Sequence, residues 1–91
     1  MKEYKDASGR LTIDLTDNDQ QFNMFVPRLK KNCKARLIQN LDGLEQRYWD
    51  FEIDGVTVVL HSDPMMGVSI HVEDGSKEDF LRFVATKCLE E

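Results

Sequence analysis

Apolar and polar residues alternate in several short segments of the chain, a pattern that predicts β-strands. In the first of them, Leu11, Ile13 and Leu15 fall on one face of the strand and polar residues on the other. A later segment alternates less regularly, because Leu37 and Ile38 are adjacent. We expect strands at 10–15, 35–41, 48–53, 56–61 and 68–72.

The strongest local signal is the pair of alternating segments joined by Asp54-Gly55. A two-residue Asp-Gly connection predicts a type I′ hairpin, because both turn positions need a positive φ angle. This turn fixes the register, and a slip by one residue would expose the apolar face to water. The core face is expected to hold Trp49, Phe51, Ile53, Val56, Val58 and Leu60. The opposite, outer face of the hairpin is expected to hold Tyr48, Asp50, Glu52, Thr57, Val59 and His61.

Apolar residues at steps of three and four predict an amphipathic helix over about 18–32, with Thr16 as its capping residue. Pro27 lies inside this segment, where a proline costs roughly 3 kcal/mol and either kinks the helix or begins a new one. The apolar spacing continues through Pro27, which favours one helical region bent near 24–27. Its apolar stripe comprises Phe22, Phe25, Val26, Leu29 and Cys33.

A second helix is expected after Ser76 and Asp79, which have the spacing of a capping box. The order of the elements predicts an α+β fold, with one mainly antiparallel sheet of four to five strands and two helices packed on one face (β-α-β-β-β-β-α). The 91 residues suffice for a single domain over 1–91, in which residues 1–9 are open to disorder. The stripe of the second helix comprises Phe80, Leu81, Phe83, Val84, Ala85 and Cys88.

The formal net charge of −5 is unevenly distributed. Residues 1–47 contain nine Lys or Arg against seven Asp or Glu (+2), whereas residues 48–91 contain three against ten (−7). An acidic half disfavours nucleic acid and favours a basic protein partner. The basic run at 28–36 lacks interleaved aromatic residues, so we interpret it as the solvated end of a helix. No segment approaches the roughly 20 apolar residues of a membrane span.

Candidate catalytic chemistry is sparse. His61 and His71 lie on the outer face by alternation, and a metal site or acid-base pair there is one interpretation, although their spacing matches no known ligand pattern. The alternative is a pair of solvent-facing strand histidines. Cys33 and Cys88 fall on apolar helix stripes, which predicts buried, reduced thiols and a cytosolic protein. We expect no catalytic residues, no metal and no cofactor.

The outer sheet face is the remaining candidate site. It mixes acidic, aromatic and imidazole side chains, which are found where a protein meets a partner. The alternative is the ordinary wet face of an antiparallel sheet. The candidate protein-binding residues are Tyr48, Asp50, Glu52, Asp54, Thr57, Val59, His61, Asp63, Ser69 and His71.

The segments 49–55, 60–63 and 67–70 resemble small bacterial proteins of uncharacterised families and the immunity proteins of contact-dependent inhibition and other polymorphic toxin systems. The resemblance implies a cytosolic protein that neutralises a toxin, and it assigns no role to any residue. Together with the acidic second half, it favours a binding protein that neutralises a basic partner. Two alternatives remain open: a small enzyme or metal protein that uses His61 and His71, and a homodimer formed through an exposed sheet edge or the outer face.

Overall fold

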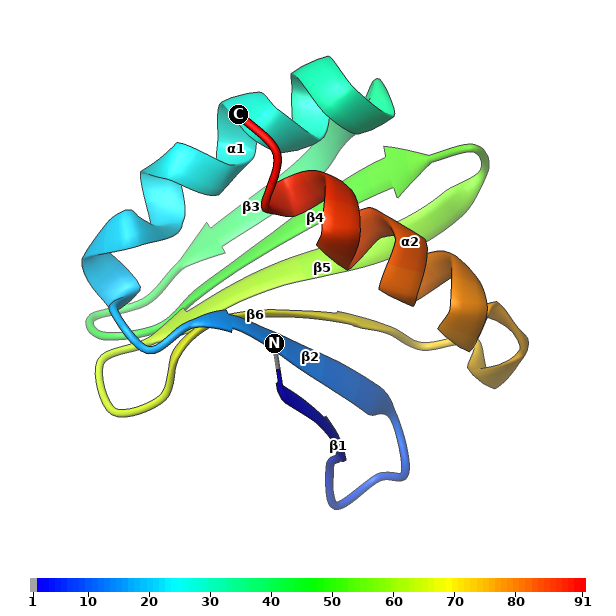
Figure 1. Cartoon of the computed structure of the whole chain (residues 1–91). Helices are drawn as coiled ribbons and strands as arrows, with labels where there is room; N and C mark the ends of the chain where they lie inside the picture. Colours follow the sequence, from blue (N-terminus) through cyan, green and yellow to red (C-terminus); the bar gives the residue numbers. More distant parts are fainter. Residues whose placement is uncertain (1) are drawn as a thin grey trace.

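The structure, a computed structural model, describes residues 2–91 and shows an α+β protein with one open antiparallel sheet of six strands (Figure 1). The spatial order of the strands is β1-β2-β6-β5-β4-β3. One short 3₁₀ turn precedes each helix. The strands are β1 (Lys2–Lys5), β2 (Leu11–Thr16), β3 (Arg36–Asp42), β4 (Arg47–Ile53), β5 (Val56–Asp63) and β6 (Gly67–Val72). The helical elements are η1 (Asp19–Gln21), α1 (Phe22–Cys33), η2 (Gly75–Lys77) and α2 (Glu78–Cys88).

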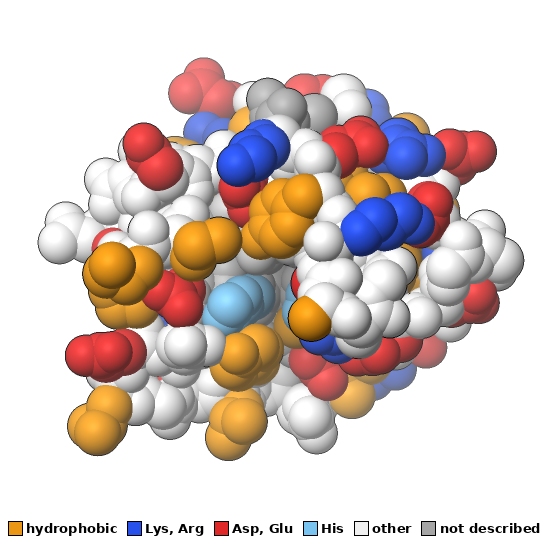
Figure 2. All heavy atoms as spheres, turned by 90° about the horizontal axis from the view of Figure 1, so that it is seen from below, with side chains coloured by type: hydrophobic (Ala, Val, Ile, Leu, Met, Phe, Trp, Pro, Cys, Tyr) orange, Lys and Arg blue, Asp and Glu red, His pale blue; other side chains and the backbone are white. Residues whose placement is uncertain are grey.

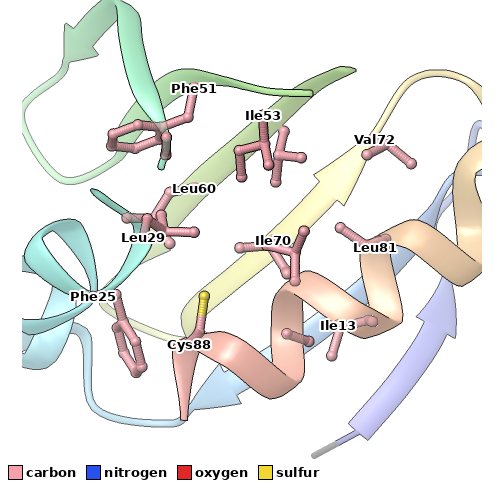
Figure 3. Close-up of a cluster of buried hydrophobic side chains, with 14 of the residues drawn as sticks. Ile13, Phe25, Leu29, Phe51, Ile53, Leu60, Ile70, Val72, Leu81 and Cys88 are labelled. Carbon is pink, nitrogen blue, oxygen red and sulfur yellow. The ribbon is translucent and has the colours of Figure 1, made fainter. Parts of the chain in front are cut away.

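Both helices cover the same face of the sheet, as the sequence predicts, so the fold has two layers (Figure 1). The hydrophobic core lies between them, and Figure 3 shows apolar side chains of both helices directed toward those of the strands. Burial of these side chains at roughly 1.5–3 kcal/mol each is the main force that holds the layers together. Fully buried members of the core include Ile13, Phe25, Leu29, Phe51, Leu60, Ile70 and Leu81.

The hairpin at Asp54-Gly55 is confirmed. Asp54 and Gly55 have φ angles of +51° and +78°, as a type I′ turn requires. Strands β4 and β5 pair in the predicted register, with Ile53 opposite Val56 and Tyr48 opposite His61. The inner residues of the hairpin lie in the core or against it.

The sixth strand, β1, was not predicted, and it lies within the segment that the sequence left open to disorder. It pairs with β2 at one edge of the sheet. The turn between them is organised by Asp6, whose carboxylate accepts hydrogen bonds from the backbone N–H groups of Ser8 and Arg10 at 2.9 and 3.0 Å. Local polar contacts therefore hold this strand in place without an apolar alternation.

Two predicted capping residues are each wrong by two positions. Asn18 caps η1 by accepting a hydrogen bond from the Gln20 N–H, and the Thr16 hydroxyl accepts one from the Asn18 N–H instead. Before η2, the capping side chain is Asp74 rather than Ser76. A 3₁₀ turn stands before each α-helix, and the observed cap lies two positions after the predicted one at the first helix and two positions before it at the second.

Helix α1 is continuous through Pro27. It also supports the end of α2, where the carbonyl oxygens of Lys87 and Cys88 accept hydrogen bonds from the side chains of Asn32 and Arg28. These bonds satisfy carbonyl groups that the end of a helix leaves without a partner. Within the residues described, no helix is long and apolar enough to cross a membrane.

The structure explains one irregular segment of the sequence and corrects one further prediction. Strand β3 contains an irregularity between Leu37 and Gln39, which places Ile38 outside the regular pairing and explains the imperfect alternation there. Phe83, assigned to the apolar stripe of α2, is 51% exposed and has the Lys87 ammonium 5.6 Å from its ring centroid. Its position on the helix points it away from the sheet.

Candidate functional site

The structure does not gather the ten candidate residues into one open platform. Asp54 and Asp63 lie at opposite ends of β5, so they belong to different surfaces. The rest lie on the outer sheet face but differ in exposure. Tyr48 and Thr57 are exposed, Asp50, Glu52 and His61 are half-buried, and Val59, Ser69 and His71 are buried.

The acids of the outer sheet face are already engaged. Glu52 forms an ion pair with Arg36 of β3 at 2.6 Å, and Asp50 accepts a hydrogen bond from the Gln39 side chain at 3.3 Å. Both contacts join β4 to β3 across the edge of the sheet. The charge of Glu52 is therefore partly neutralised by Arg36, whereas Asp50 keeps its charge because its partner Gln39 is neutral.

The charge asymmetry of the sequence is also reduced by folding. Five ion pairs join a basic or acidic residue of the first half to an opposite charge of the second half, among them Arg10 with Glu73 at 2.7 Å. The strands β6, β5 and β4 lie in the middle of the sheet between β2 and β3 of the first half, so the +2 and −7 segments do not become two separate poles. The other four pairs are Lys5–Glu78, Arg28–Glu91, Arg36–Glu52 and Glu3–Arg82.

Four of the eight acids that have no ion pair within residues 2–91 lie at one end of the sheet, which we call the loop end and define by the connections 17–21, 43–46 and 63–66. Asp17, Asp19, Glu45 and Asp63 lie there, and in residues 2–91 none of them is within ion-pair distance of a cation. The same loops expose large apolar side chains. Leu44, Met65 and Met66 are 105%, 90% and 54% exposed.

A groove of about 370 Å³ separates the start of α1 from the β3–β4 connection. Arg47 lines this groove, and two aromatic rings hold its guanidinium in place. The guanidinium lies 4.9 Å from the Phe22 ring centroid and 5.6 Å from that of Trp49. Arg47 also donates to Asn23 Oδ1 at 3.3 Å. These contacts fix the Arg47 side of the groove. Leu44 lines the groove as well.

A second recess lies on the outer sheet face, and we call it the hollow. It encloses about 160 Å³ and is lined by Tyr4, Asp6, Arg10, Thr12, Tyr48, His61, Ser69 and His71. Tyr4 and Tyr48 stand on strands four positions apart in the sheet, so the face must be concave for both to line one recess. Figure 2 shows the histidines inside this hollow with hydrophobic side chains around it.

The two histidines are not directly paired across the strands. His61 lies opposite Ser69, and His71 lies opposite Val59, so the imidazoles are diagonal neighbours. Burial lowers the pKa of both histidines from the ordinary value. Among residues 2–91 there is no group of three or more His, Cys, Asp or Glu side chains placed to hold a metal ion.

The tautomer of His61 follows from its neighbour Gln46. The Gln46 Oε1 atom accepts a hydrogen bond from the Tyr48 hydroxyl at 2.6 Å and lies 3.1 Å from His61 Nε2. A carbonyl oxygen only accepts, so Nε2 carries the hydrogen and Nδ1 of the neutral ring is an acceptor. The Tyr48 ring is stacked on His61, with centroids 4.3 Å apart, which fixes the imidazole plane.

The lowered pKa of the histidines predicts a loss of stability in mild acid. Burial is the largest cause for His71, followed by Arg10, while Glu73 and Asp6 oppose the shift and His61 adds to it. Because the unfolded chain takes up a proton near pH 6.5 before the folded chain does, the free energy of unfolding should fall between pH 7.5 and 5.5. Urea unfolding at both pH values should show a smaller fall for His61→Gln/His71→Gln than for the unmodified protein. An equal fall in the two proteins would assign the pH dependence to other groups.

Cys33 and Cys88 are free cysteines. Burial raises the pKa of Cys88 to about 12 and also raises that of Cys33, which is half-buried. The neutral thiol is therefore the stable form of both side chains, and neither is an activated nucleophile.

Comparisons with protein-family models, curated proteins and solved structures find no match for this chain. The fold and the recesses define an α+β protein with an open antiparallel sheet, two helices on one face, and a concave opposite face beside an acidic and apolar loop end. Sequence reasoning did not anticipate the loop end or the contribution of Tyr4, Arg10 and Thr12 to the hollow. Two signals in the sequence point to these features. The alternation of 10–15 places Thr12 on the outer face, and Leu44 is an isolated apolar residue that follows a turn.

Proposed function

We propose that this chain is a cytosolic binding protein that receives a basic protein partner at the loop end and the adjoining part of the outer sheet face. The single observation that carries the proposal is the coincidence of unpaired acids and exposed large apolar side chains in three converging loops. A toxin with a cationic active site is the partner class that we propose, which would make the chain an immunity protein. The sequence resemblance described above supports this choice.

The charge of the loop end favours a cationic partner. Residues 16–21, 42–47 and 62–67 contain five acids and one arginine, a net charge of −4 on three neighbouring connections. The arginine, Arg47, lies against aromatic rings and is 3.5 Å from Asp42. A surface of this sign accelerates the encounter with a positive partner, and the acceleration weakens as salt is added.

The apolar side chains supply affinity that charge alone does not. Leu44 and Met65 project from adjacent connections and are almost wholly in contact with water. Burial of apolar area contributes roughly 25 cal/mol per Å², and flexible methionines adapt to irregular surfaces. A partner that inserts an apolar residue between these loops, with cations around it, would match both features.

The experiment is a comparison of two charge reversals with equal effect on net charge. In Asp17→Lys/Glu45→Lys, both changes lie at the loop end; in Asp79→Lys/Glu90→Lys, both lie on or beside α2 on the other layer. We expect the first pair to slow association with a candidate toxin that has a cationic active site about tenfold or more at low salt, and the second pair to have a much smaller effect. The measurement is stopped-flow or surface-based kinetics at several salt concentrations.

Equal slowing by the two pairs would show that only total charge matters, and the loop end would lose its proposed role. A stable dimer of the chain alone, seen by light scattering at twice the 10.6 kDa monomer mass and abolished by the loop-end pair, would also contradict the proposal. In that case the surface would join two copies of the chain instead of receiving a partner.

A further inference from the structure

The floor of the hollow consists of polar side chains that have no hydrogen-bond partner within residues 2–91. Thr12, Ser69 and His71 are only 5%, 7% and 7% exposed. None of their side-chain atoms takes part in the hydrogen bonds of residues 2–91, yet none is sealed off from solvent in the way that Asp14 Oδ1 is. Nearly buried polar groups of this kind are normally paired, so these three point into the space that remains, which is the hollow.

The hollow offers a ligand several hydrogen-bond acceptors, and its hydroxyl groups can also donate. Thr12 and Ser69 offer hydroxyl oxygens, and the tautomer of His61 makes its Nδ1 atom an acceptor. The one arginine in the lining, Arg10, is already bonded to Asp6 at 2.9 Å and to Glu73 at 2.7 Å. Among the described residues that line the hollow, an anionic ligand would therefore find no cation without carboxylate partners.

The electrostatic surroundings are negative. Arg10 with its two carboxylates carries a net charge of −1, and both histidines are held neutral by burial. Asp14 lies opposite Ser69 on the next strand, and together with burial it raises the pKa of Tyr4. One of the Asp14 oxygens is buried without a hydrogen-bond partner in residues 2–91.

The walls are aromatic. Tyr4 and Tyr48 line opposite sides, and aromatic ring faces attract cations. The Lys2 ammonium already lies 5.9 Å from the Tyr4 ring centroid. The hollow has a volume of about 160 Å³, which roughly five water molecules occupy in the liquid. A guanidinium with its adjoining methylene also has about five heavy atoms, so a group of this size fits the hollow.

We propose that the hollow is a recognition pocket for a single cationic head group, the guanidinium or ammonium of an arginine or lysine side chain. This inference rests on the proposed function, because the partner would supply that side chain. The donors of the head group bond to Thr12, Ser69 and His61, and its charge lies between the two tyrosine rings. Gln46, which belongs to the loop end and bonds to both Tyr48 and His61, connects the pocket to the main contact surface.

The test uses small probes and needs no partner. Nα-acetyl-arginine amide is titrated into the ¹⁵N-labelled protein, with Nα-acetyl-citrulline amide as the neutral probe of the same shape and propionate as the anion. We expect saturable shifts at the amides of Thr12, Ser69 and His71 with a dissociation constant of about 1 mM or weaker, as a ligand of this size allows. Citrulline should bind at least fivefold more weakly, and propionate should leave these amides unchanged.

Two variants localise the binding. Ser69→Leu places an apolar side chain in the hollow and should abolish the shifts, and Thr12→Val removes one hydroxyl at constant volume and should weaken binding about threefold. Thr57→Val makes the same exchange on the outer face away from the hollow and should change nothing. Equal binding of citrulline, binding of propionate, or no response to any probe would overturn the proposal.

The partner protein separates this inference from the function on which it rests. If Ser69→Leu binds the partner as tightly as the unmodified chain while the loop-end charge reversal is impaired, the pocket is refuted and the proposed function stands. If neither variant affects the partner, the contact surface itself is refuted. If both weaken it and the arginine probe competes with the partner, both proposals hold.

Discussion

Gly67→Ala should be the most damaging single substitution outside the core. Gly67 has a φ angle of +94°, which side chains rarely adopt, and an added Cβ would lie 2.0 Å from the Thr16 carbonyl oxygen and 2.6 Å from Asp17 Cα. Both contacts are with backbone, which cannot rotate away. Backbone strain and overpacking each cost about 1–3 kcal/mol, so we expect a loss of about 4 kcal/mol or more in the free energy of unfolding. In a chain of this size the melting temperature should fall by about 15 °C or more.

Gly9→Ala is the matched control for this prediction. Gly9 has a similar φ angle of +86°, but nothing lies within 4 Å of its added Cβ. It therefore carries the conformational strain without the steric clash, and we expect a loss of about 1 kcal/mol. Urea unfolding of the two variants isolates the cost of the close approach. If the two losses are equal, the end of β2 does not cross Gly67 as closely as the structure shows.

The close approach at Gly67 also matters for the candidate site. Gly67 begins β6, directly after the 63–66 connection, and it touches the first residues of the 17–21 connection. Two of the three loops of the loop end are thus held together at one glycine. A milder substitution that preserves the fold but separates these loops should weaken partner binding as well.

Features fixed by neighbouring residues were predictable from the sequence. The Asp54-Gly55 turn determines the register of β4 and β5 by itself, so the inner and outer faces of that hairpin were assigned correctly. The two apolar helix stripes likewise determined which layer the helices form. Strand β1 could not be found this way, because Lys2–Lys5 has no apolar alternation and depends on its pairing with β2.

The candidate site was harder to predict because it depends on the path of the whole chain. Alternation places His71 and Val59 on the outer face, but only the curvature of the sheet shows that both are 7% exposed. The partners of Glu52 and Glu73 come from the first half of the chain, so their neutralisation is invisible in local composition. The loop end unites connections that are about 20 residues apart in sequence, and the strand order alone brings them together.

The loop end and the hollow differ in shape and charge, and each suits a different part of a protein interface. The loop end is broad, acidic and partly apolar, which suits the bulk of a protein interface. The hollow is small and has a polar floor, which suits one side chain. An interface that combines an extended surface with a single anchored residue typically gains most of its affinity from a few central groups and its association rate from the surrounding charge.

Removal of the exposed apolar side chains of the loop end should have the largest effect on binding. For Leu44→Ala/Met65→Ala we expect the affinity for the partner to fall about 100-fold, because central apolar contacts often contribute about 1–2 kcal/mol each and 1.4 kcal/mol corresponds to tenfold. The stability of the chain alone should hardly change, since both side chains are almost fully in water. Calorimetric titration measures the first quantity and urea unfolding the second.

The control for this pair is Phe83→Ala/Leu89→Ala, which removes two apolar side chains of 51% and 47% exposure from α2 and its end, away from the loop end. It should leave partner affinity within about twofold, because those residues lie on the helical layer. An equal loss of affinity in both pairs would mean that partner binding depends on the total exposed apolar area and not on its position at the loop end. A large loss of stability in the loop-end pair would instead show that Leu44 and Met65 support the fold, and the exposure of these side chains would then have no bearing on a partner.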